Sequence, residues 1–445
     1  MEEAATGHIL FGLDPLWIST ALLIATYAAI TTEKLNRAIV ALVGAGLMIS
    51  LGVLNQEQAV AGIDFNTLAL LTGMMLIVAI ARRCGIFQYV AIRSAKAARA
   101  SPAGILAMLA VVTAIISALL DNVTTVLLIA PVTLVICREL NVKPYPFLFS
   151  EIFASNIGGT ATLIGDPPNI IIGSAANLSF MDFVHALTPV VVIILAVNCL
   201  AMHLIWGRSM KATAEARARV MALDHRDAIT DRPLMRKSII VITLVILAFV
   251  LARTLKLEAG TIALFGAAIL LLLDNVGRSA EEQHQRLIES FNEVEWITIF
   301  FFVGLFIVVA GVEHAGLLKM LADWLVIATK GDQQLMGVAI LWVSAVLSAI
   351  IDNIPFVATM IPVIKNMGPS FGGDQALIPL WWALSLGACL GGNGTLIGAS
   401  ANLTVAGIGE RAGVPFRFVE FLKVAFPLML ISIAISHAYL AWRYL

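Results

Sequence analysis

Long apolar stretches separated by short polar segments run through almost the whole chain. Two of them, 146–177 and 377–409, are interrupted by glycine-rich phrases, and eight others are continuous and suited to a hydrocarbon layer about 30 Å thick. A helix satisfies its own backbone groups inside lipid, so the pattern predicts an all-α membrane protein with ten spans, two of them broken. The continuous spans are expected near 15–31, 37–54, 65–81, 182–206, 238–252, 259–273, 296–312 and 421–442.

Composition supports this class. Hydrophobic residues make up 60% of the 445 residues, charged residues 13%, and the mean hydropathy is +0.94, values that exclude an ordinary soluble domain. The net charge of −1 gives no reason to expect a nucleic-acid partner, whereas a lipid bilayer is an expected partner. The first 15 residues are acidic and lack a basic region, so no cleavable signal peptide is expected.

Basic residues predict the orientation. In the first half, Lys and Arg gather in alternate connecting segments, while segments 1–14, 55–64 and 176–184 contain none. Because cytoplasmic loops carry the excess of Lys and Arg, the N-terminus is predicted outside and the mid-chain linker 207–237 inside. The linker itself has the mixed charge of a solvated connector, and a partner-binding surface is the alternative interpretation.

Two unusual phrases each occur twice. DNVTTVLLIAP at 121–131 returns as DNIPFVATMIP at 352–362, and GGTATLIGDPPN at 158–169 returns as GGNGTLIGASAN at 391–402. The offsets are 231 and 233 residues, and the second half starts on the opposite side of the membrane from the first. Duplicated helix-breaking phrases in halves of opposite orientation predict an inverted-repeat transporter.

The first phrase of each pair predicts a re-entrant helical hairpin. Residues 102–120 and 124–137 are short for crossing alone, and basic residues at both ends place both ends on the cytoplasmic side. The tip is then Asp121 to Thr124. By the same reasoning 335–366 enters from outside with its tip at Asp352. Non-helical backbone at this depth must be buried in protein or line a wet cavity, so the two tips are expected to meet around a chamber.

The glycine-rich phrases are predicted to break two helices and to expose half-helix N-termini toward that chamber. The alternative is that their small residues only permit close helix packing. The predicted breaks lie at Gly158, Gly159, Gly165, Gly391, Gly392, Gly394 and Gly398. The predicted substrate-binding side chains are neutral: Asn122, Thr124, Thr160, Thr162, Asn169, Asn353, Asn393, Thr395 and Asn402. No Arg or Lys occurs within the phrases.

Three carboxylates lie inside the phrases: Asp121, Asp166 and Asp352. Intramembrane carboxylates are functional candidates because burying a charge is costly, and we expect one of them to carry a coupling proton or cation. The alternative is that Asp121 or Asp352 caps a half-helix. Asp166 differs from the others because its repeat counterpart is Ala399.

Enzymatic chemistry is not predicted. The sequence shows no nucleophile–base pair, nucleotide-binding loop or zinc set, and Cys84, Cys137, Cys199 and Cys389 lack metal-ligand spacing, so no metal and no cofactor are expected. Any drive by ATP would have to come from a separate ATPase subunit.

The four duplicated phrases resemble those of the ion transporter superfamily, in the branch that contains ArsB arsenite pumps and the pink-eyed dilution P proteins. The resemblance covers nearly the whole chain. It implies a scaffold (1–100 and 238–333), a mobile transport domain (101–206 and 334–445) and the cytoplasmic linker 207–237. It also implies elevator-type movement, a homodimer and a place in a prokaryotic inner membrane.

The tips here read Asp-Asn, whereas those of the more distant sodium–dicarboxylate symporters read Ser-Asn-Thr. A carboxylate at the tip repels an anionic cargo, which disfavours dicarboxylates. Neutral arsenous or antimonous acid suits a pocket of uncharged polar groups, so the hypothesis is arsenite or antimonite export by proton antiport. The alternatives are a sodium/proton antiporter or anion transporter of the P-protein type, and a passive channel.

Overall fold

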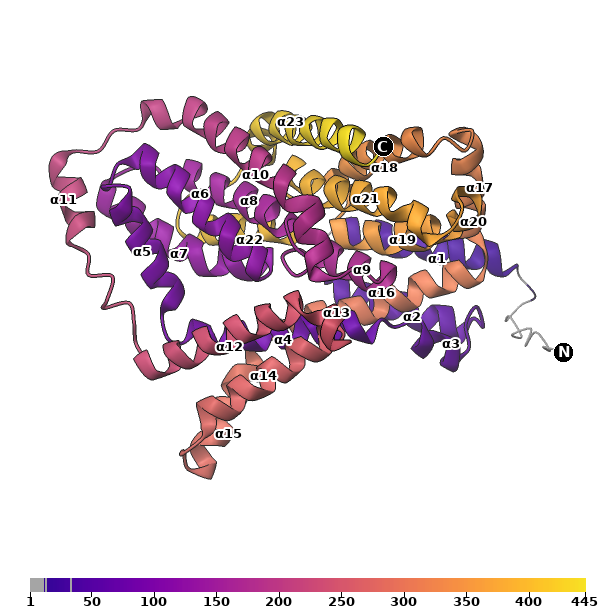
Figure 1. Ribbon diagram of the computed structural model, residues 1–445, viewed down its shortest axis with the longest axis horizontal. Helices are drawn as coiled ribbons and strands as arrows, with labels where there is room; N and C mark the ends of the chain where they lie inside the picture. The colour runs from indigo at the N-terminus through magenta and orange to yellow at the C-terminus, as the bar shows by residue number, and fades with distance from the viewer. Residues whose placement is uncertain (1–11, 13, 33) are drawn as a thin grey trace.

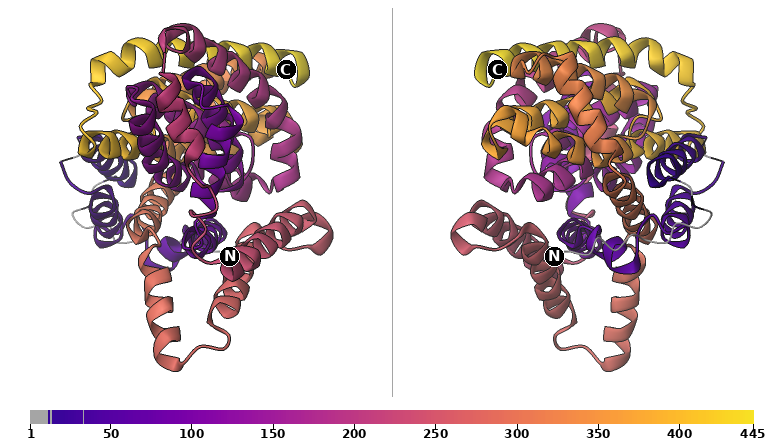
Figure 2. Two further views of the ribbon diagram at one scale, coloured as in Figure 1. Left: turned by 90° about the vertical axis from the view of Figure 1, so that its left-hand side faces the viewer. Right: turned by 90° about the vertical axis from the view of Figure 1, so that its right-hand side faces the viewer.

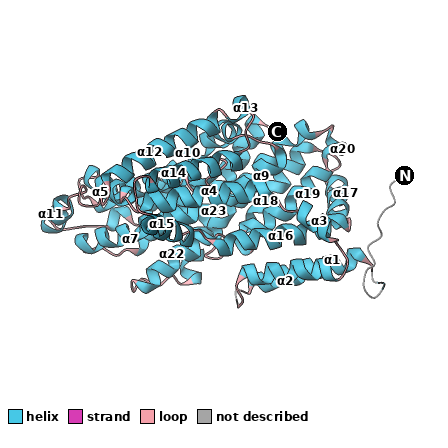
Figure 3. Ribbon diagram, turned by 90° about the horizontal axis from the view of Figure 1, so that it is seen from below, coloured by secondary structure: helices cyan, strands magenta, loops and turns pink. Residues whose placement is uncertain are grey.

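The computed structural model describes residues 12, 14–32 and 34–445, and this part of the chain is helical with no strand (Figure 3). The prediction about a signal peptide concerns residues 1–15, of which 1–11 and 13 lie outside the described residues. The all-α fold class is confirmed.

The first repeat contains ten helices within the described residues. Polar caps begin several of them: Asp14, Asn36 and Asp64 each accept a backbone N–H at the start of a span. The helices are α1 (Pro15–Thr31), α2 (Arg37–Ser50), α3 (Gln56–Ala61), α4 (Phe65–Arg82), α5 (Ile86–Ala97), α6 (Pro102–Leu119), α7 (Asn122–Leu140), α8 (Tyr145–Thr160), α9 (Pro167–Ala176) and α10 (Phe180–Ile205).

A linker with the short helix α11 (Ala214–Ala222) leads to the second repeat, which has the same order of long elements. Its helices are α12 (Arg232–Val250), α13 (Ala252–Leu255), α14 (Ala259–Asn275), α15 (Ala280–Asn292), α16 (Trp296–His314), α17 (Leu317–Ala328), α18 (Gln333–Ile350), α19 (Asn353–Asn366), α20 (Gly368–Phe371), α21 (Ile378–Gly391), α22 (Ser400–Arg411) and α23 (Phe418–Arg443).

The helices form two layers, seen one above the other in Figure 1. The upper, here named the hairpin layer, consists of α6–α10 and α18–α23. The lower, named the second layer, is built mainly from α2, α4, α12 and α14, and α14 continues into α15, which projects from the body (Figure 2). Helix α11 lies at one end of the molecule, while α3 and α17 lie at the other. Helix α5 lies beside α11, and its repeat counterpart α17 lies at the opposite end, so the two repeats run in opposite directions (Figure 1).

The hairpin predicted in the first repeat is present. Arg217 in α11 donates to the carbonyl of Arg99, just before α6, and Arg219 donates to that of Glu139, near the end of α7. Both arms therefore start and end beside the linker. The second arm has 19 residues and is longer than the expected 124–137, whereas the first has 18 residues and is close to the expected 102–120. Length and hydropathy alone would allow either to cross, so the prediction that the arms are too short was wrong; their shared end identifies the hairpin.

Nine described helices have the length and composition of a membrane span. This set includes hairpin arms and omits three shorter apolar helices, α1, α2 and α14, so it does not count crossings.

Two glycines show how the repeats interlock. A methyl group on Gly73 of α4 would lie 2.5 Å from the Ala263 carbonyl carbon in α14, and one on Gly304 of α16 would lie 2.6 Å from that of Ala41 in α2. Each helix thus crosses a helix of the other repeat at backbone contact, and the two crossings are related as counterparts.

Candidate functional site

The two hairpin tips meet at one carboxylate. The Asn122 amide nitrogen lies 3.2 Å from Asp166 Oδ1, and that of Asn353 lies 3.4 Å from the same oxygen. Asn122 comes from the first hairpin, Asn353 from the second, and Asp166 from the break between α8 and α9. The structure thus brings together side chains that the sequence separates by up to 231 positions, the distance from Asn122 to Asn353.

Local capping fixes the tips. Asp121 Oδ1 accepts the Thr124 N–H at 2.8 Å, and Asp352 Oδ1 accepts the Ile354 N–H at 3.1 Å. Each aspartate therefore begins the second arm of its hairpin in the way an N-cap does. The capping interpretation holds for both residues, and the second oxygen of each takes no part in the cap; that of Asp352 accepts from Arg37 and Ser400.

Asp166 has a different environment. Its side chain is 0% exposed, and Oδ2 has no hydrogen-bond partner within the part of the chain that the structure describes. No ion pair forms at Asp166 among these residues either. An ionised carboxylate in such a place is strongly unfavourable.

Asn156 links the two halves behind Asp166. It accepts from Asn122 Nδ2 at 3.0 Å and donates to the side-chain oxygens of Asn393 and Asn402, both at 2.9 Å. The side chain is fully buried. The sequence analysis did not select Asn156 because its counterpart is Cys389 and no repeat symmetry marks it. An asparagine two residues before a duplicated phrase was the available signal.

The helix breaks are held by matched bonds. Thr162 Oγ1 donates to the Ala118 carbonyl and Thr395 Oγ1 to that of Ala349, both at 2.5 Å, which ties each break to its hairpin. Asn169 and Asn402 donate to carbonyls of their own breaks. These four side chains were predicted to bind substrate. Their hydrogen-bonding groups are engaged within the protein, so in this structure they support the chamber.

Close packing at the breaks involves the predicted glycines. A methyl group on Gly158 would lie 2.2 Å from the Ala114 carbonyl oxygen, and Gly159 and Gly165 approach each other equally closely. The second copy repeats this: Gly391 lies against Ala345, while Gly392 and Gly398 face each other and Gly394 lies against Ala349. The glycines therefore serve both interpretations, since they end the helices and also permit backbone contact.

The remaining predicted residues lie at the same level. Thr160 Oγ1 donates to the Asn156 carbonyl, and Asn393 Nδ2 is buried with no partner among the described residues. Thr124 contributes its backbone N–H to the Asp121 cap. Of the predicted polar set, Asn122 and Asn353 line the enclosed chamber.

This central chamber has a volume of about 20 Å³, enough for one water-sized species. The lining adds four polar residues that the sequence analysis missed: Arg37, Glu295, Thr298 and Ser400. The full lining is Arg37, Leu71, Met75, Asp121, Asn122, Val123, Asp166, Pro167, Glu295, Thr298, Asn353, Ile354 and Ser400.

Arg37 is the first residue of α2. Among the described residues that line the chamber, it is the one with a positively charged side chain. Its guanidinium donates to Asp352 Oδ2 at 2.9 Å and to Ser400 Oγ at 2.6 Å, and lies 5.0 Å from the centre of the Phe301 ring. This joins the second layer to the hairpin layer. The duplicated phrases contain no cation, but the folded protein brings one to them from another segment.

Comparison with known proteins places these features in a family. The model of the CitMHS family, described as citrate transporter, matches residues 27–387, which include both hairpins and the first helix break. The chain belongs to the citrate transporter family. It is a membrane transporter, in agreement with the general prediction, while an assignment to the ArsB branch is not supported.

One relative within the citrate transporter family is an uncharacterized transporter of Mycobacterium tuberculosis. It is 44% identical over 431 residues, and the match covers 96% of this chain and 98% of that protein. The human P protein is 34% identical over 504 residues, covering 95% of this chain and 59% of that protein. The match to the human P protein confirms the predicted resemblance to P proteins.

Two solved structures share the fold at 12% sequence identity. The YdaH transporter of Alcanivorax borkumensis matches with a TM-score of 0.58 over 97% of this chain and 99% of that one. MtrF of Neisseria gonorrhoeae, placed in a class of antimetabolite efflux pumps, matches with a TM-score of 0.58 over 98% and 96%.

Proposed function

We propose that this transporter exchanges a small uncharged oxyacid, arsenite or antimonite, for protons, and that Asp166 binds the proton. The observation that carries the proposal is the fully buried Asp166 carboxylate with one oxygen free. Proton binding there removes the charge, and the protonated group can donate to a cargo hydroxyl.

The charges around the chamber favour a neutral cargo. Asp121, Asp166 and Glu295 line it, against the single guanidinium of Arg37, which is already paired with Asp352. A multiply charged anion would face repulsion at short range in a low-dielectric site. A trihydroxy acid meets neutral amides and carboxylates instead, and these can accept its protons in hydrogen bonds.

A second candidate is sodium/proton exchange. A chamber of about 20 Å³ among carboxylates suits a small cation, and the P protein is a relative along 95% of this chain. Arsenous acid requires the chamber to widen, whereas sodium does not. The anion-transport alternative is supported by the description of the family as citrate transporter and by Arg37, although the charge of Arg37 is already paired with Asp352.

For the movement, we propose that the hairpin layer (101–206 and 334–445) slides against the second layer (1–100 and 238–333) as an elevator. The two tips and the helix breaks belong to one layer, so the chamber would move as a unit. Arg37, Glu295 and Thr298 belong to the other layer and would be exchanged during the movement.

Transport in inverted membrane vesicles with an acidic interior tests the proposal. One-to-one exchange predicts arsenite accumulation of up to about tenfold per pH unit, because each pH unit supplies about 1.4 kcal/mol. Asp166→Asn, which keeps shape and removes the titrating group, should abolish accumulation. The matched control Asp323→Asn, at an exposed carboxylate of α17, should not.

The outcomes separate the candidates. Accumulation of labelled sodium without arsenite would replace the oxyacid by sodium. Flux that only runs downhill and ignores the pH gradient would indicate a channel. Undiminished arsenite accumulation by Asp166→Asn would refute the role of Asp166.

A further inference from the structure

The second layer contains a repeat of its own that the duplicated phrases do not reveal. Helices α1 and α2 correspond to α12 and α14 at an offset of 222 residues, which matches the first-turn residue Arg37 with Ala259 and Gly44 with Gly266. The same offset relates Ala41 and Ala263, the two residues that contact Gly304 and Gly73. The correspondence is therefore one of spatial position as well as sequence.

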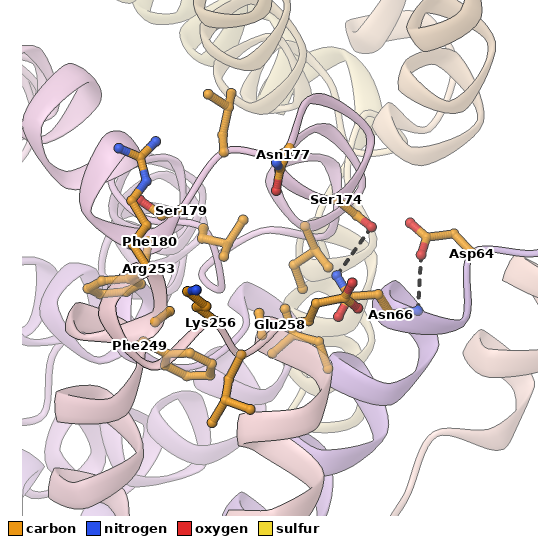
Figure 4. Close-up of a pocket in the computed structure, with 18 residues that line it drawn as sticks. Asp64, Asn66, Ser174, Asn177, Ser179, Phe180, Phe249, Arg253, Lys256 and Glu258 are labelled. Carbon is orange, nitrogen blue, oxygen red and sulfur yellow. Dashed lines mark hydrogen bonds between the residues drawn. The ribbon is translucent and has the colours of Figure 1, made fainter.

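This correspondence relates two open pockets. One, named the Arg37 pocket, is lined by Asn36, Arg37 and Leu403, among others. The other, named the Lys256 pocket, is lined at the counterpart positions by Glu258, Ala259 and Ile170 (Figure 4). The Arg37 pocket lies where α1 ends and α2 begins, and the Lys256 pocket lies where α12 ends and α14 begins. The two pockets are thus copies of one site, turned toward opposite faces.

The two pockets differ in whether a hairpin tip forms part of the wall. In the Arg37 pocket, the second hairpin tip forms part of the wall through Ile350, Ile351 and Asp352, and the volume is about 330 Å³. The counterparts at the first tip, 119–121, are absent from the lining of the Lys256 pocket, whose volume is about 750 Å³. The Lys256 pocket therefore has the walls of a docking site and space for a hairpin tip.

We propose that the Lys256 pocket is the second docking site of the hairpin layer, where the first tip binds and Asp121 pairs with Lys256. The inference rests on the proposed elevator movement and is independent of the cargo. In the present structure Asp352 pairs with Arg37. The counterpart of Arg37 is Ala259, which carries no charge, so another residue must supply the cation.

Lys256 meets this requirement. It lines the pocket (Figure 4) and has no ion-pair partner within the described part of the chain. The other cation of the lining, Arg253, is held by Asp182 at 2.7 Å. At the first site the guanidinium of Arg37 also donates to Ser400 and lies over the ring of Phe301. The ammonium group of Lys256 offers a single charge without these contacts, so binding of the hairpin tip at the second docking site is weaker.

The same repeat correspondence predicts that one contact between the layers breaks and its counterpart forms when the first tip docks. Tyr27 Oη now lies 2.5 Å from Thr359 Oγ1, joining α1 to α19. Their counterparts are Phe249 in α12 and Leu128 in α7. Phe249 lines the Lys256 pocket and at present stacks on Phe180. Docking of the first tip should bring Phe249 beside Leu128.

Paired cysteines test this in membranes with a bifunctional thiol reagent as long as a tyrosine side chain. Tyr27→Cys with Thr359→Cys should cross-link the present state, and Phe249→Cys with Leu128→Cys the proposed one. Each cross-link should stop transport until it is cleaved. Adding Lys256→Gln should lower the ratio of the second cross-link to the first about two- to fivefold, the worth of a partly exposed ion pair.

Lys34→Gln is the matched control, because Lys34 is the exposed counterpart of Lys256 and Arg37 already holds the tip on that side. Failure of the Phe249/Leu128 pair to cross-link under either pH gradient, while the Tyr27/Thr359 pair does, overturns the docking site. A ratio unchanged by Lys256→Gln overturns the role of Lys256. Both cross-links without arsenite transport would reject the cargo and leave the docking site standing.

Discussion

Replacement of Asn156 by alanine tests the polar network that joins the two repeats. The side chain makes three bonds of 2.9–3.0 Å, to Asn122, Asn393 and Asn402, and it is 0% exposed. Alanine removes all three at once. The amide of Asn122 keeps its bond to Asp166, whereas the side-chain oxygens of Asn393 and Asn402 lose their donor.

The expected loss of stability follows from these bonds. A buried polar group left unsatisfied costs about 1–3 kcal/mol, and two such oxygens give about 2–6 kcal/mol. We expect the Asn156→Ala variant to lose about 4 kcal/mol in free energy of unfolding. We also expect transport to be lost, since Asn122 and Asn393 would no longer be held in register.

Equilibrium unfolding in mixed micelles of increasing SDS content measures the change. The control is Ser155→Ala, one residue away and equally buried, whose hydroxyl bonds only to Ile152 in its own helix. That variant should lose about 1 kcal/mol or less. A loss for Asn156→Ala no larger than for Ser155→Ala would refute the inference that this residue ties the repeats together.

Three further changes have defined outcomes. Gly158→Ala should abolish accumulation of folded protein, because its methyl group would lie 2.2 Å from a carbonyl oxygen, while Gly407→Ala, with no atom within 4 Å of the added methyl, should express normally. Arg37→Ala should lower the free energy of unfolding by about 2 kcal/mol, between the values for exposed and buried pairs, since the two side chains are 26% and 16% exposed. The double variant with Asp352→Asn should recover part of this loss, and a double variant less stable than the single would contradict the pairing. Asp274→Ala should cost about 3 kcal/mol, because the carboxylate is 2% exposed and lies between three arginines; unchanged unfolding would show that these arginines need no counter-charge.

The sequence predicted the parts of the site that the repeat duplicates. Asp-Asn tips and glycine breaks stand out because polar, helix-breaking residues are rare at membrane depth, and their recurrence at a fixed offset marks both copies. Their convergence on Asp166 follows from the opposite orientation of the halves.

Residues without a repeat partner could not be found in this way. Arg37 was read as an ordinary basic residue at the end of a span, because its counterpart is Ala259 and only the fold brings α2 beside the second hairpin tip. Asn156 was missed for the same reason. The roles of Thr162 and Thr395 also needed coordinates, since a threonine that bonds a carbonyl 44 or 46 residues away cannot be told from one that faces a solute.

The crossing of α2 with α16 and of α4 with α14 bears on how the protein is made. When the ribosome has released only the first half, α2 and α4 are in the bilayer. The helices that pack against them at Ala41 and Gly73 have not yet been synthesised. Helices α2 and α4 remain exposed to lipid, or held by the insertion machinery, until α14 and α16 of the second half are synthesised. If the gene were cut within the linker, neither product would survive alone, and joint expression of both would be needed to restore the protein.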